Sequence, residues 1–509
     1  MFAKVSSAAI MGIDAYPLDI EVDVSGSVPR FVIVGLPDTS VTEAKERVRT
    51  ALYNSKLKFP QRRIIVNMAP ADIRKEGASF DLPIAMGILA ATDQIEAEKL
   101  MEFLVVGELA LDGNIRRING VLPVVSMMKN LGYNKILLPK ENAEEASLVS
   151  GIDIYPTGSL RESVNILRAE ELFSPYKPSD DGKFQPDYPV DFSEVKGQEA
   201  AKRALEVSAA GGHNILMIGP PGSGKTMLAK RMPTILPPMT RGEALEVTRI
   251  YSISGLLPID RALILERPFR SPHHSASKAG LVGGGAIPKP GEVSLAHRGV
   301  LFLDEMPEFE RNALEVLRQP MEDGLVTISR AQISLTFPAQ FMLVGSMNPC
   351  PCGFATDPVK ECTCSQWQKQ RYLTKLSGPL LDRIDIHIEV PRLKFDELSR
   401  YRPGESSDEI RKRVTSARQI QKERFRDLKI FANADMTAKH IKKYCKLPED
   451  AKTLLKVANE QLGLSARAYD RIHKLARTIA DLAGIEEIAT EHIAEAVQYR
   501  SLDRGGGLG

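Results

Sequence analysis

The segment GPPGSGKT, from Gly219 to Thr226, constrains the fold of this 509-residue chain more than any other stretch. It matches the pattern G-x-x-x-x-G-K-[ST], whose glycines let backbone amides close around phosphates at the N-terminus of a helix. The apolar run 215–218 precedes it and the helix-like MLAKRM follows it, as that mechanism requires. The sequence therefore predicts an α/β core in which one loop binds ATP, with the residues Gly219, Pro220, Pro221, Gly222, Ser223, Gly224, Lys225 and Thr226. In this loop Lys225 supplies a positive charge to the β- and γ-phosphates, and Thr226 offers its hydroxyl to Mg²⁺.

The run GVLFLDE places four apolar residues directly before Asp304 and Glu305. A buried strand that ends in two carboxylates can hold Mg²⁺ through the first and polarise the attacking water through the second. Such a run is often no more than the end of a strand. Together with the phosphate loop, it predicts a hydrolytic site.

Two further polar residues follow apolar or helical runs. FMLVGSMNP ends in Asn348, whose amide is placed to orient a water near the γ-phosphate. LSGPLLDRIDIHIEV carries Arg383, for which two interpretations stay open. It is either an arginine finger that acts across a subunit boundary or the partner of Asp382 or Asp385 in a structural ion pair.

The helical stretch LSARAYDRIHKLARTIADL carries Arg467, Arg471 and Lys474 at spacings i, i+4 and i+7. These spacings place the three cations on one face of a helix. The face either reads the nucleotide or is simply a solvated basic surface.

The order of phosphate loop, D-E strand, strand-end asparagine, LLDRID arginine and helical arginine resembles that of AAA+ ATPases. The segments RPFRSPHHSASKAGLVGGG, PGEVSLAHRGVLFLDEMPEF and MNPCPCG are similar to those of the magnesium-chelatase-like ComM/YifB family of bacteria. The resemblance covers essentially the whole chain. It implies that Asn348 is sensor 1, Arg383 the arginine finger and Arg467 the sensor 2 residue.

Membership of this family implies a homo-oligomeric ring, usually a hexamer, with ATP between neighbouring subunits. It also implies work on DNA, because ComM-type proteins are described as helicases that drive branch migration during recombination. The alternatives are a magnesium-chelatase-like or protein-remodelling chaperone, and an ATP-regulated switch. Glu305 argues against the switch, because a binding module needs no carboxylate poised for water.

The proline-bearing segment SPYKPSDDGKFQPDYPVDF predicts a linker between domains. Before it, β-rich runs such as residues 31–36, 62–69 and 135–139 alternate with helix-like runs such as 41–55. After about residue 406 the pattern is almost wholly helical. We expect a multidomain α/β protein made of an N-terminal α+β domain (1–173), a linker (174–190), the AAA+ core (191–400), a helical lid (401–503) and a disordered tail (504–509).

The N-terminal domain resembles the proteolytic domain of Lon, with a ribosomal S5-like fold, in KEGASFDLPIA and in residues 107–146. Lon uses a serine activated by a lysine. Ser79 falls near the place of the serine, but Leu122 stands where the lysine belongs, so we expect no peptidase activity. The basic pairs Arg62/Arg63, Arg74/Lys75 and Arg116/Arg117 are either DNA contacts or solvated surface.

The insertion RPFRSPHHSASKAGLVGGGAIPKP is rich in glycine and basic residues. It suits a pore loop that follows a nucleic-acid backbone by charge, or it is a packed surface loop with partly buried histidines. A second insertion, residues 324–341, alternates like a β-hairpin with its tip near Arg330. The candidate DNA contacts are Arg270, His273, His274, Lys278 and Arg330.

Four of the five cysteines, Cys350, Cys352, Cys362 and Cys364, fall within fifteen residues. The chain shows neither a secretory signal nor a membrane-spanning run, so we expect a cytoplasmic protein, in which structural disulfides are disfavoured. A closed Zn²⁺ site is the favoured interpretation, while iron–sulfur ligation, free or redox thiols and disulfides stay open. The net charge of +2 predicts no polyanion partner by itself.

Overall fold

The computed structural model describes all residues except 27, 73–74, 170–171, 179–187, 286–287, 330–333, 394–403, 429, 463–464 and 501–509. The chain forms two compact units. The first consists of Met1–Phe184 with Ala244–Ile264, and the second of Gln185–Glu243 with Leu265–Gly509. Residues 179–187 of the predicted linker and the predicted tail, 504–509, lie outside the described residues.

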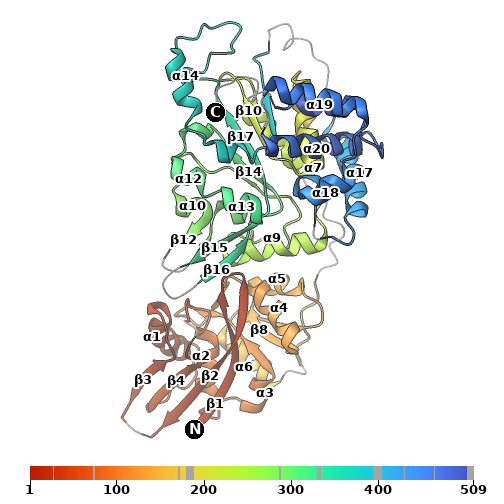
Figure 1. Cartoon of the computed structure of the whole chain (residues 1–509). Coiled ribbons are helices and arrows are strands. Elements are labelled where there is room, and N and C mark those ends of the chain that lie inside the picture. Colours follow the sequence, from red (N-terminus) through yellow and green to blue (C-terminus); the bar gives the residue numbers. More distant parts are fainter. Residues whose placement is uncertain are drawn as a thin grey trace. The chain divides into compact units, whose positions relative to one another are not determined.

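The first unit is built on a mixed seven-stranded sheet with the strand order β3-β4-β2-β1-β5-β8-β9 (Figure 1). β1 pairs with β2 and β2 with β4 in antiparallel fashion, whereas β3 with β4, β1 with β5, β5 with β8 and β8 with β9 run parallel. The strands are β1 Phe2–Met11, β2 Asp14–Ser25, β3 Arg30–Val34, β4 Arg63–Ala69, β5 Phe103–Val105, β8 Lys135–Pro139 and β9 Asp153–Thr157, with β6 Glu108–Leu109 and β7 Ile115–Arg116 as a separate pair.

Helices on both sides of this sheet bury alternate side chains of its strands. In β5, Phe103 and Val105 join the core that contains α1 and α2, whereas Leu104 joins the core that contains α4. This alternation is the side-chain period of a strand buried on both faces. The helices are α1 Thr39–Asn54, α2 Asp81–Ala90, α3 Ala97–Met101, α4 Val121–Leu131, α5 Ala143–Ser147 and α6 Leu160–Arg168.

Residues 244–264 belong to the first unit although they follow the phosphate loop in the sequence. α9, Arg241–Ile253, carries the chain there. The buried Ser252 donates a hydrogen bond to Glu145 and accepts one from the backbone of Gly120 at 3.0 Å. These buried polar contacts fix the excursion within the first unit.

The second unit contains a five-stranded parallel sheet with the order β11-β14-β17-β10-β18. Its strands are β10 Ile215–Ile218, β11 Phe269–Arg270, β14 Val300–Leu303, β17 Met342–Met347 and β18 Ile386–Glu389. β12 Gly283–Gly284 pairs with β13 Lys289–Pro290, and the predicted hairpin is formed by β15 Leu325–Ser329 and β16 Ser334–Pro338. The predicted strand at residues 215–218 and the buried strands before Asp304 and Asn348 are confirmed.

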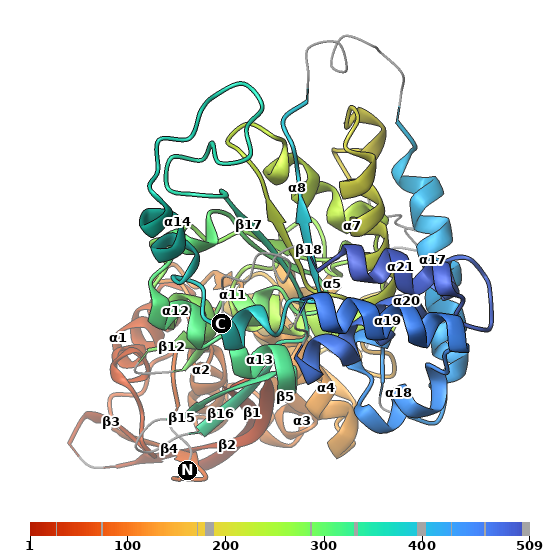
Figure 2. The ribbon, with the colours of Figure 1, turned by 45° about the horizontal axis from the view of Figure 1, so that its top comes forward.

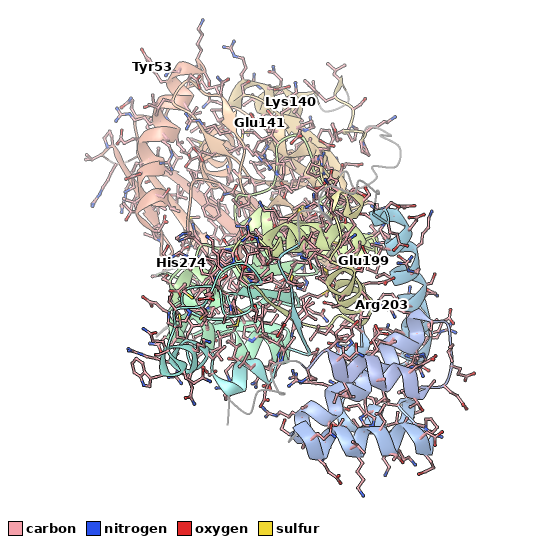
Figure 3. The ribbon with its side chains drawn as sticks, turned by 90° about the horizontal axis from the view of Figure 1, so that it is seen from above. Tyr53, Lys140, Glu141, Glu199, Arg203 and His274 are labelled. Carbon is pink, nitrogen blue, oxygen red and sulfur yellow. The ribbon has the colours of Figure 1, made fainter. Side chains whose placement is uncertain are left out.

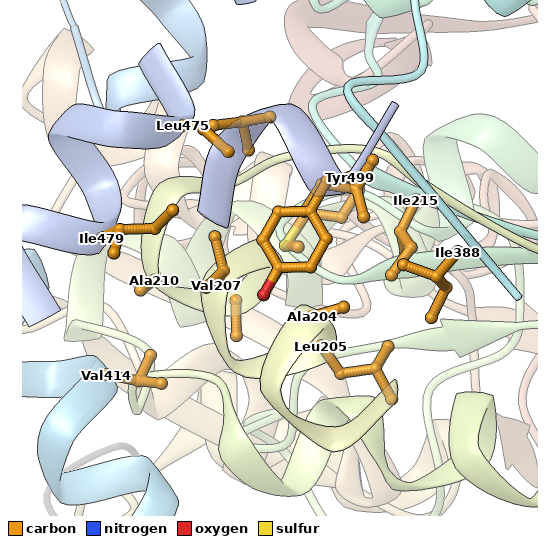
Figure 4. Close-up of a cluster of buried hydrophobic side chains, with 14 of the residues drawn as sticks. Ala204, Leu205, Val207, Ala210, Ile215, Ile388, Val414, Leu475, Ile479 and Tyr499 are labelled. Atoms are coloured by element: carbon orange, nitrogen blue, oxygen red, sulfur yellow. The ribbon is translucent and has the colours of Figure 1, made fainter. Parts of the chain in front are cut away.

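Helices of the C-terminal region pack on the sheet through α7, which lies between them and the strands. Figure 4 shows Ala204 and Val207 of α7 between Ile215 on one side and Leu475 of α20 on the other. The predicted parallel α/β core and helical C-terminal region are therefore confirmed. The helices of the unit are α7 Glu199–Gly211, α8 Lys225–Ile235, α10 Lys278–Val282, α11 Glu292–Leu295, α12 Arg311–Glu315, α13 Arg318–Asp323, α14 Gln366–Leu373, α15 Gly378–Leu381, α17 Ser407–Arg424, α18 Ala438–Tyr444, α19 Glu449–Leu462, α20 Ala466–Leu482 and α21 Thr490–Gln498. Among the helices that the structure describes, none has the length and apolar character of a membrane span.

Candidate active site and cysteine cluster

The phosphate loop connects the C-terminal end of β10 to the N-terminus of α8. Gly219 permits a close approach, because a Cβ there would lie 2.1 Å from the carbonyl oxygen of Val390. Gly224 caps α8 with φ +93°, a conformation that favours glycine. The buried Ser223 hydroxyl has no hydrogen-bond partner among the described residues, so the loop presents a free polar group of the kind that a phosphate would engage.

Lys225 is 8% exposed and turns its ammonium toward its own loop. Nζ donates to the carbonyls of Gly219 at 2.8 Å and Pro220 at 3.0 Å, and it lies 3.5 Å from Oδ1 of Asn348. Burial lowers the pKa of Lys225, while the nearby carboxylates of Asp304 and Glu305 act in the opposite direction. The cation therefore sits among predicted site residues from three strand ends.

Asp304 is held by hydroxyl groups from two other elements. Thr226 donates to Oδ2 at 2.8 Å, and Ser346 donates to Oδ1. The backbone N–H of Glu305 lies 3.1 Å from Oδ1 of Asp304 and 3.2 Å from Oγ of Ser346. Thr226 and Asp304, the two predicted Mg²⁺ ligands, are thus in direct contact, and the oxygen donors they offer are those that Mg²⁺ prefers.

Ser346 was not predicted as a site residue. It belongs to β17, whose Gly345 is in register with Leu303 of β14, so Ser346 comes beside Asp304. Its side chain is completely buried. The hydroxyl directly before Met347 and Asn348 was visible in the sequence, but its role depends on which strand lies beside β14.

Glu305 follows Asp304 directly and is the second carboxylate of the predicted hydrolytic site. Glu305 is exposed and adopts a left-handed backbone conformation, φ +51° and ψ +48°. A non-glycine residue in this region is strained, and such residues concentrate at functional sites. The structure therefore brings Lys225, Thr226, Asp304 and Asn348 into contact, with Glu305 adjoining them.

Arg383 forms an ion pair, but with a different partner from those considered. Its guanidinium contacts Glu322 and donates to the carbonyl of Pro379 at 2.6 Å, and the side chain is only 10% exposed. Asp382 and Asp385 instead pair with Arg467 at 3.7 Å and Arg471 at 3.2 Å. The partners suggested by the sequence, Asp382 and Asp385, are therefore wrong, and the ion pair that Arg383 forms within its own chain is with Glu322.

The interpretation of α20 as a solvated basic face is wrong for two of the three cations on that helix. Arg471 is 13% exposed, and Lys474 donates to the carbonyl of Ala434 at 2.7 Å, with burial lowering its pKa. Arg467 alone is largely exposed. Although burial opposes its charge, Arg471 and His213 hold the pKa of Asp385 well below the usual range.

The four clustered cysteines converge. Sγ of Cys350 lies 3.4 Å from Cys352 and 3.7 Å from Cys362, and Cys352 and Cys362 are 3.7 Å apart. All four Sγ atoms lie within 4.8 Å of one another. In a tetrahedral site with Zn–S bonds of about 2.3 Å, the sulfur atoms lie about 3.8 Å apart. The spacing therefore suits a tetrahedral metal and exceeds that of a disulfide, and all five cysteines are free thiols.

The thiols of the cluster differ in pKa. A backbone hydrogen bond from Phe354 lowers the pKa of Cys352 to about 6, whereas burial raises the pKa of Cys350 to about 12. The backbone N–H of Cys352 also donates to Sγ of Cys364 at 3.4 Å. Donors of this kind stabilise sulfur atoms that carry negative charge, as metal-bound thiolates do.

The candidate DNA contacts lie in different environments. Arg270 forms a two-point ion pair with Glu292 at 2.6 and 2.8 Å. His273 is exposed, and its ring centroid lies 4.0 Å from that of the half-buried His274, which Figure 3 labels. Lys278 is exposed at the start of α10. Arg330 lies outside the described residues.

In the first unit, Ser79 is half-buried before α2 and Leu122 is buried in α4. Lys75 is wholly buried and donates to the carbonyl of Pro70, so it is neither solvated surface nor placed to meet DNA. Arg74 lies outside the described residues. Arg116 is exposed and pairs with Glu108 at 3.5 Å, whereas Arg117 donates to the carbonyl of Leu257 at 3.1 Å.

Three family descriptions match the chain. They are "Subunit ChlI of Mg-chelatase" over residues 20–142, "Magnesium chelatase, subunit ChlI" over 191–398 and "Magnesium chelatase, subunit ChlI C-terminal" over 404–500. The matched ranges leave out residues 1–19, 143–190, 399–403 and 501–509.

Some relatives match over nearly the full length and others over part of it. Competence protein ComM of Haemophilus influenzae is 46% identical over 99% of this chain and 98% of its own length. The protein YifB of Escherichia coli is 44% identical over 98% of this chain and 97% of its own. The magnesium-chelatase 38 kDa subunit of Cereibacter sphaeroides is 27% identical over 32% of this chain and 53% of its own. The chain belongs to the magnesium-chelatase-like family of AAA+ ATPases, in its ComM/YifB branch.

Proposed function

We propose that this chain is the subunit of a ring-forming, hexameric motor that hydrolyses ATP between subunits and remodels branched DNA. The observation that carries the ATPase is the contact of Lys225, Thr226, Asp304 and Asn348 at the ends of parallel strands. Similarity to a competence protein over nearly the whole chain supports the DNA substrate. We also propose a cytoplasmic location.

Each site residue has a role in hydrolysis. Lys225 would exchange its loop carbonyls for the β- and γ-phosphates, and Thr226 and Asp304 would hold Mg²⁺, with Ser346 orienting the carboxylate. Glu305 takes a proton from the attacking water, which Asn348 orients. Bound Mg²⁺ neutralises charge on the phosphates.

The ring supplies the remaining charges. Arg383 reaches the γ-phosphate of a neighbouring subunit after leaving Glu322, and Arg467 contributes from the helical region as the sensor 2 residue. Stabilisation of phosphoryl charge by such an arginine is worth a factor of about 1,000 to 100,000 in turnover. Hydrolysis is therefore coupled to assembly.

The insertions follow the DNA backbone in the channel of the ring. His273, His274 and Lys278 are the available contacts of the first insertion, and Arg330 is that of the hairpin, whereas the pairing of Arg270 with Glu292 makes it the weakest of the five. The first unit has a Lon-like fold without peptidase chemistry, because Leu122 offers no general base.

The cysteine cluster would hold one structural Zn²⁺. Its four sulfur donors leave no open ligand position, as in structural rather than catalytic zinc sites. Cys350 follows Asn348 by two residues, so a metal bound by the cluster would stabilise the segment that follows the water-orienting amide.

Phosphate release by the purified full-length protein tests the function. We expect single-stranded or junction DNA to raise the rate, and Glu305→Gln to abolish hydrolysis while nucleotide still binds. A rate of phosphate release that DNA did not change would favour the alternative, a magnesium-chelatase-like or protein-remodelling chaperone. The partial similarity to a magnesium-chelatase subunit supports considering that alternative.

A further inference from the structure

The helix that follows the cysteine cluster has two contrasting faces. On α14, Tyr372 is 5% exposed, and burial, with the Glu308 carboxylate, raises its pKa, whereas a backbone hydrogen bond from Asn348 acts in the opposite direction. Trp367, the single tryptophan of the chain, is 65% exposed on the same helix. One face is therefore buried while the other presents a large aromatic ring to solvent.

The exposed face pairs aromatic rings with cations. The guanidinium of Arg371, one helical turn after Trp367, lies 5.2 Å from the centre of that ring. In the preceding loop the ammonium of Lys360 lies 4.9 Å from the ring of Phe354. Such contacts hold the rings and cations in fixed relative positions.

The cysteine cluster joins these two pairs in one lobe. Phe354 comes two residues after Cys352 and Trp367 three residues after Cys364, and the Sγ atoms of the cluster lie within 4.8 Å of one another. Ser365 caps α14 immediately after Cys364. Figures 1 and 2 show α14 and its preceding loop at the margin of the second unit, away from α17 and α20.

The described cations of this lobe are not held in ion pairs, and of its two carboxylates Asp357 pairs with Arg392 at 3.6 Å, which leaves Glu361. Within the part of the chain that the structure describes, no ion pair is formed by Lys360, Lys369 or Arg371. Protein-binding surfaces are depleted in lysine at their centres, whereas surfaces for single-stranded nucleic acid combine cations with rings that stack on bases. Cations without ion pairs beside the exposed ring of Trp367 favour a nucleic-acid partner.

We propose that Phe354, Lys360, Trp367, Lys369 and Arg371, the α14 surface, bind single-stranded nucleic acid. A base stacks on Trp367 and the cations contact the flanking phosphates. The proposal rests on the proposed action on DNA and adds a contact outside the two insertions. Strand binding would act on the segment that begins two residues after the water-orienting Asn348, at Cys350, and leads into α14.

Intrinsic fluorescence tests this directly, because Trp367 is the only tryptophan. We expect a thymidine oligonucleotide to quench the full-length protein, with weaker binding at high salt. The double variant Lys369→Gln/Arg371→Gln, which keeps the reporter, should bind about tenfold more weakly. Lys442→Gln, a change of an exposed lysine on α18, should leave the titration unchanged.

Anisotropy of a labelled oligonucleotide separates failure of this proposal from failure of the proposed function. Binding and DNA-stimulated hydrolysis without any change in tryptophan fluorescence would overturn the α14 surface and leave the function standing. If tryptophan fluorescence changed with protein concentration but not with added oligonucleotide, the α14 surface would be a contact between subunits. That result would also overturn the proposal. If the oligonucleotide neither bound to the protein nor stimulated hydrolysis, the proposed DNA function itself would be refuted.

Discussion

Gly353 packs against Pro221, so the cysteine loop touches the phosphate loop directly. A Cβ on Gly353 would lie 2.7 Å from Cδ of Pro221, and the residue has φ +85°. The metal-binding segment and the nucleotide-binding segment therefore share a van der Waals boundary with no room for an added methyl group.

Replacing Gly353 by alanine should displace the phosphate loop. A side chain at positive φ in a tight contact costs about 1–2 kcal/mol, so we expect roughly tenfold weaker binding of a fluorescent ATP analogue with unchanged metal content. Gly378→Ala is the matched control, because no atom lies within 4 Å of the position of its Cβ. Equal nucleotide affinities for the two variants would contradict the packing argument.

Ser346→Ala should slow hydrolysis more than it weakens nucleotide binding. The variant removes the hydroxyl that orients Asp304, and loss of a residue that supports a metal ligand commonly lowers activity about 10- to 100-fold. Steady-state ATPase and nucleotide titration separate the two effects. Ser294→Ala removes a buried hydroxyl that has no hydrogen-bond partner among the described residues, and it should change neither.

Arg383 and Glu322 allow the two interpretations of the arginine to be separated. If Arg383 serves a neighbouring subunit, Arg383→Ala should lower turnover at least 1,000-fold, whereas Glu322→Ala should preserve it. If the residue only forms the ion pair, the two variants should lose similar stability and retain activity. ATPase rates, with oligomeric state followed by light scattering, decide between these outcomes.

Metal analysis of anaerobically purified protein should find one zinc ion per chain. Cys350→Ser/Cys364→Ser should lose it and impair assembly or ATP turnover before DNA binding, because the cluster adjoins Asn348. Cys445→Ala, at a buried cysteine apart from the cluster, should keep the metal. Iron with sulfide in place of zinc would identify an iron–sulfur cluster, and metal-free wild-type protein would refute the site.

Stability should fall as the pH drops below neutrality. Burial, with the nearby Arg500 and Arg471, lowers the pKa of His387 well below its ordinary value of 6.5. The unfolded chain takes up a proton near pH 6.5 that the folded chain does not, so protonation favours unfolding, and the free energy of unfolding declines by up to about 1.4 kcal/mol per pH unit. Thermal unfolding at several pH values should show a shallower decline for His387→Gln than for His273→Gln, a change of an exposed histidine.

The nucleotide site was predictable where its chemistry is local in sequence. The phosphate loop, the carboxylates after residues 300–303 and Asn348 each follow an apolar run that had to be a strand. Ser346 and Glu322 were not predictable, because their roles depend on which strands and helices become neighbours. The burial of Lys75 and Lys474 was likewise hidden, since spacing along a helix or loop does not reveal what covers it.

The excursion of residues 244–264 limits how the two units can be separated. The chain passes from one unit to the other three times, after residues 184, 243 and 264. A fragment that begins at residue 185 would retain Ser252 and Leu257 but lose Glu145 and Arg117, which hydrogen-bond to them. Neither unit is therefore one continuous stretch of the sequence. The ATPase cannot be exchanged between relatives as a single continuous segment without taking part of the first unit with it.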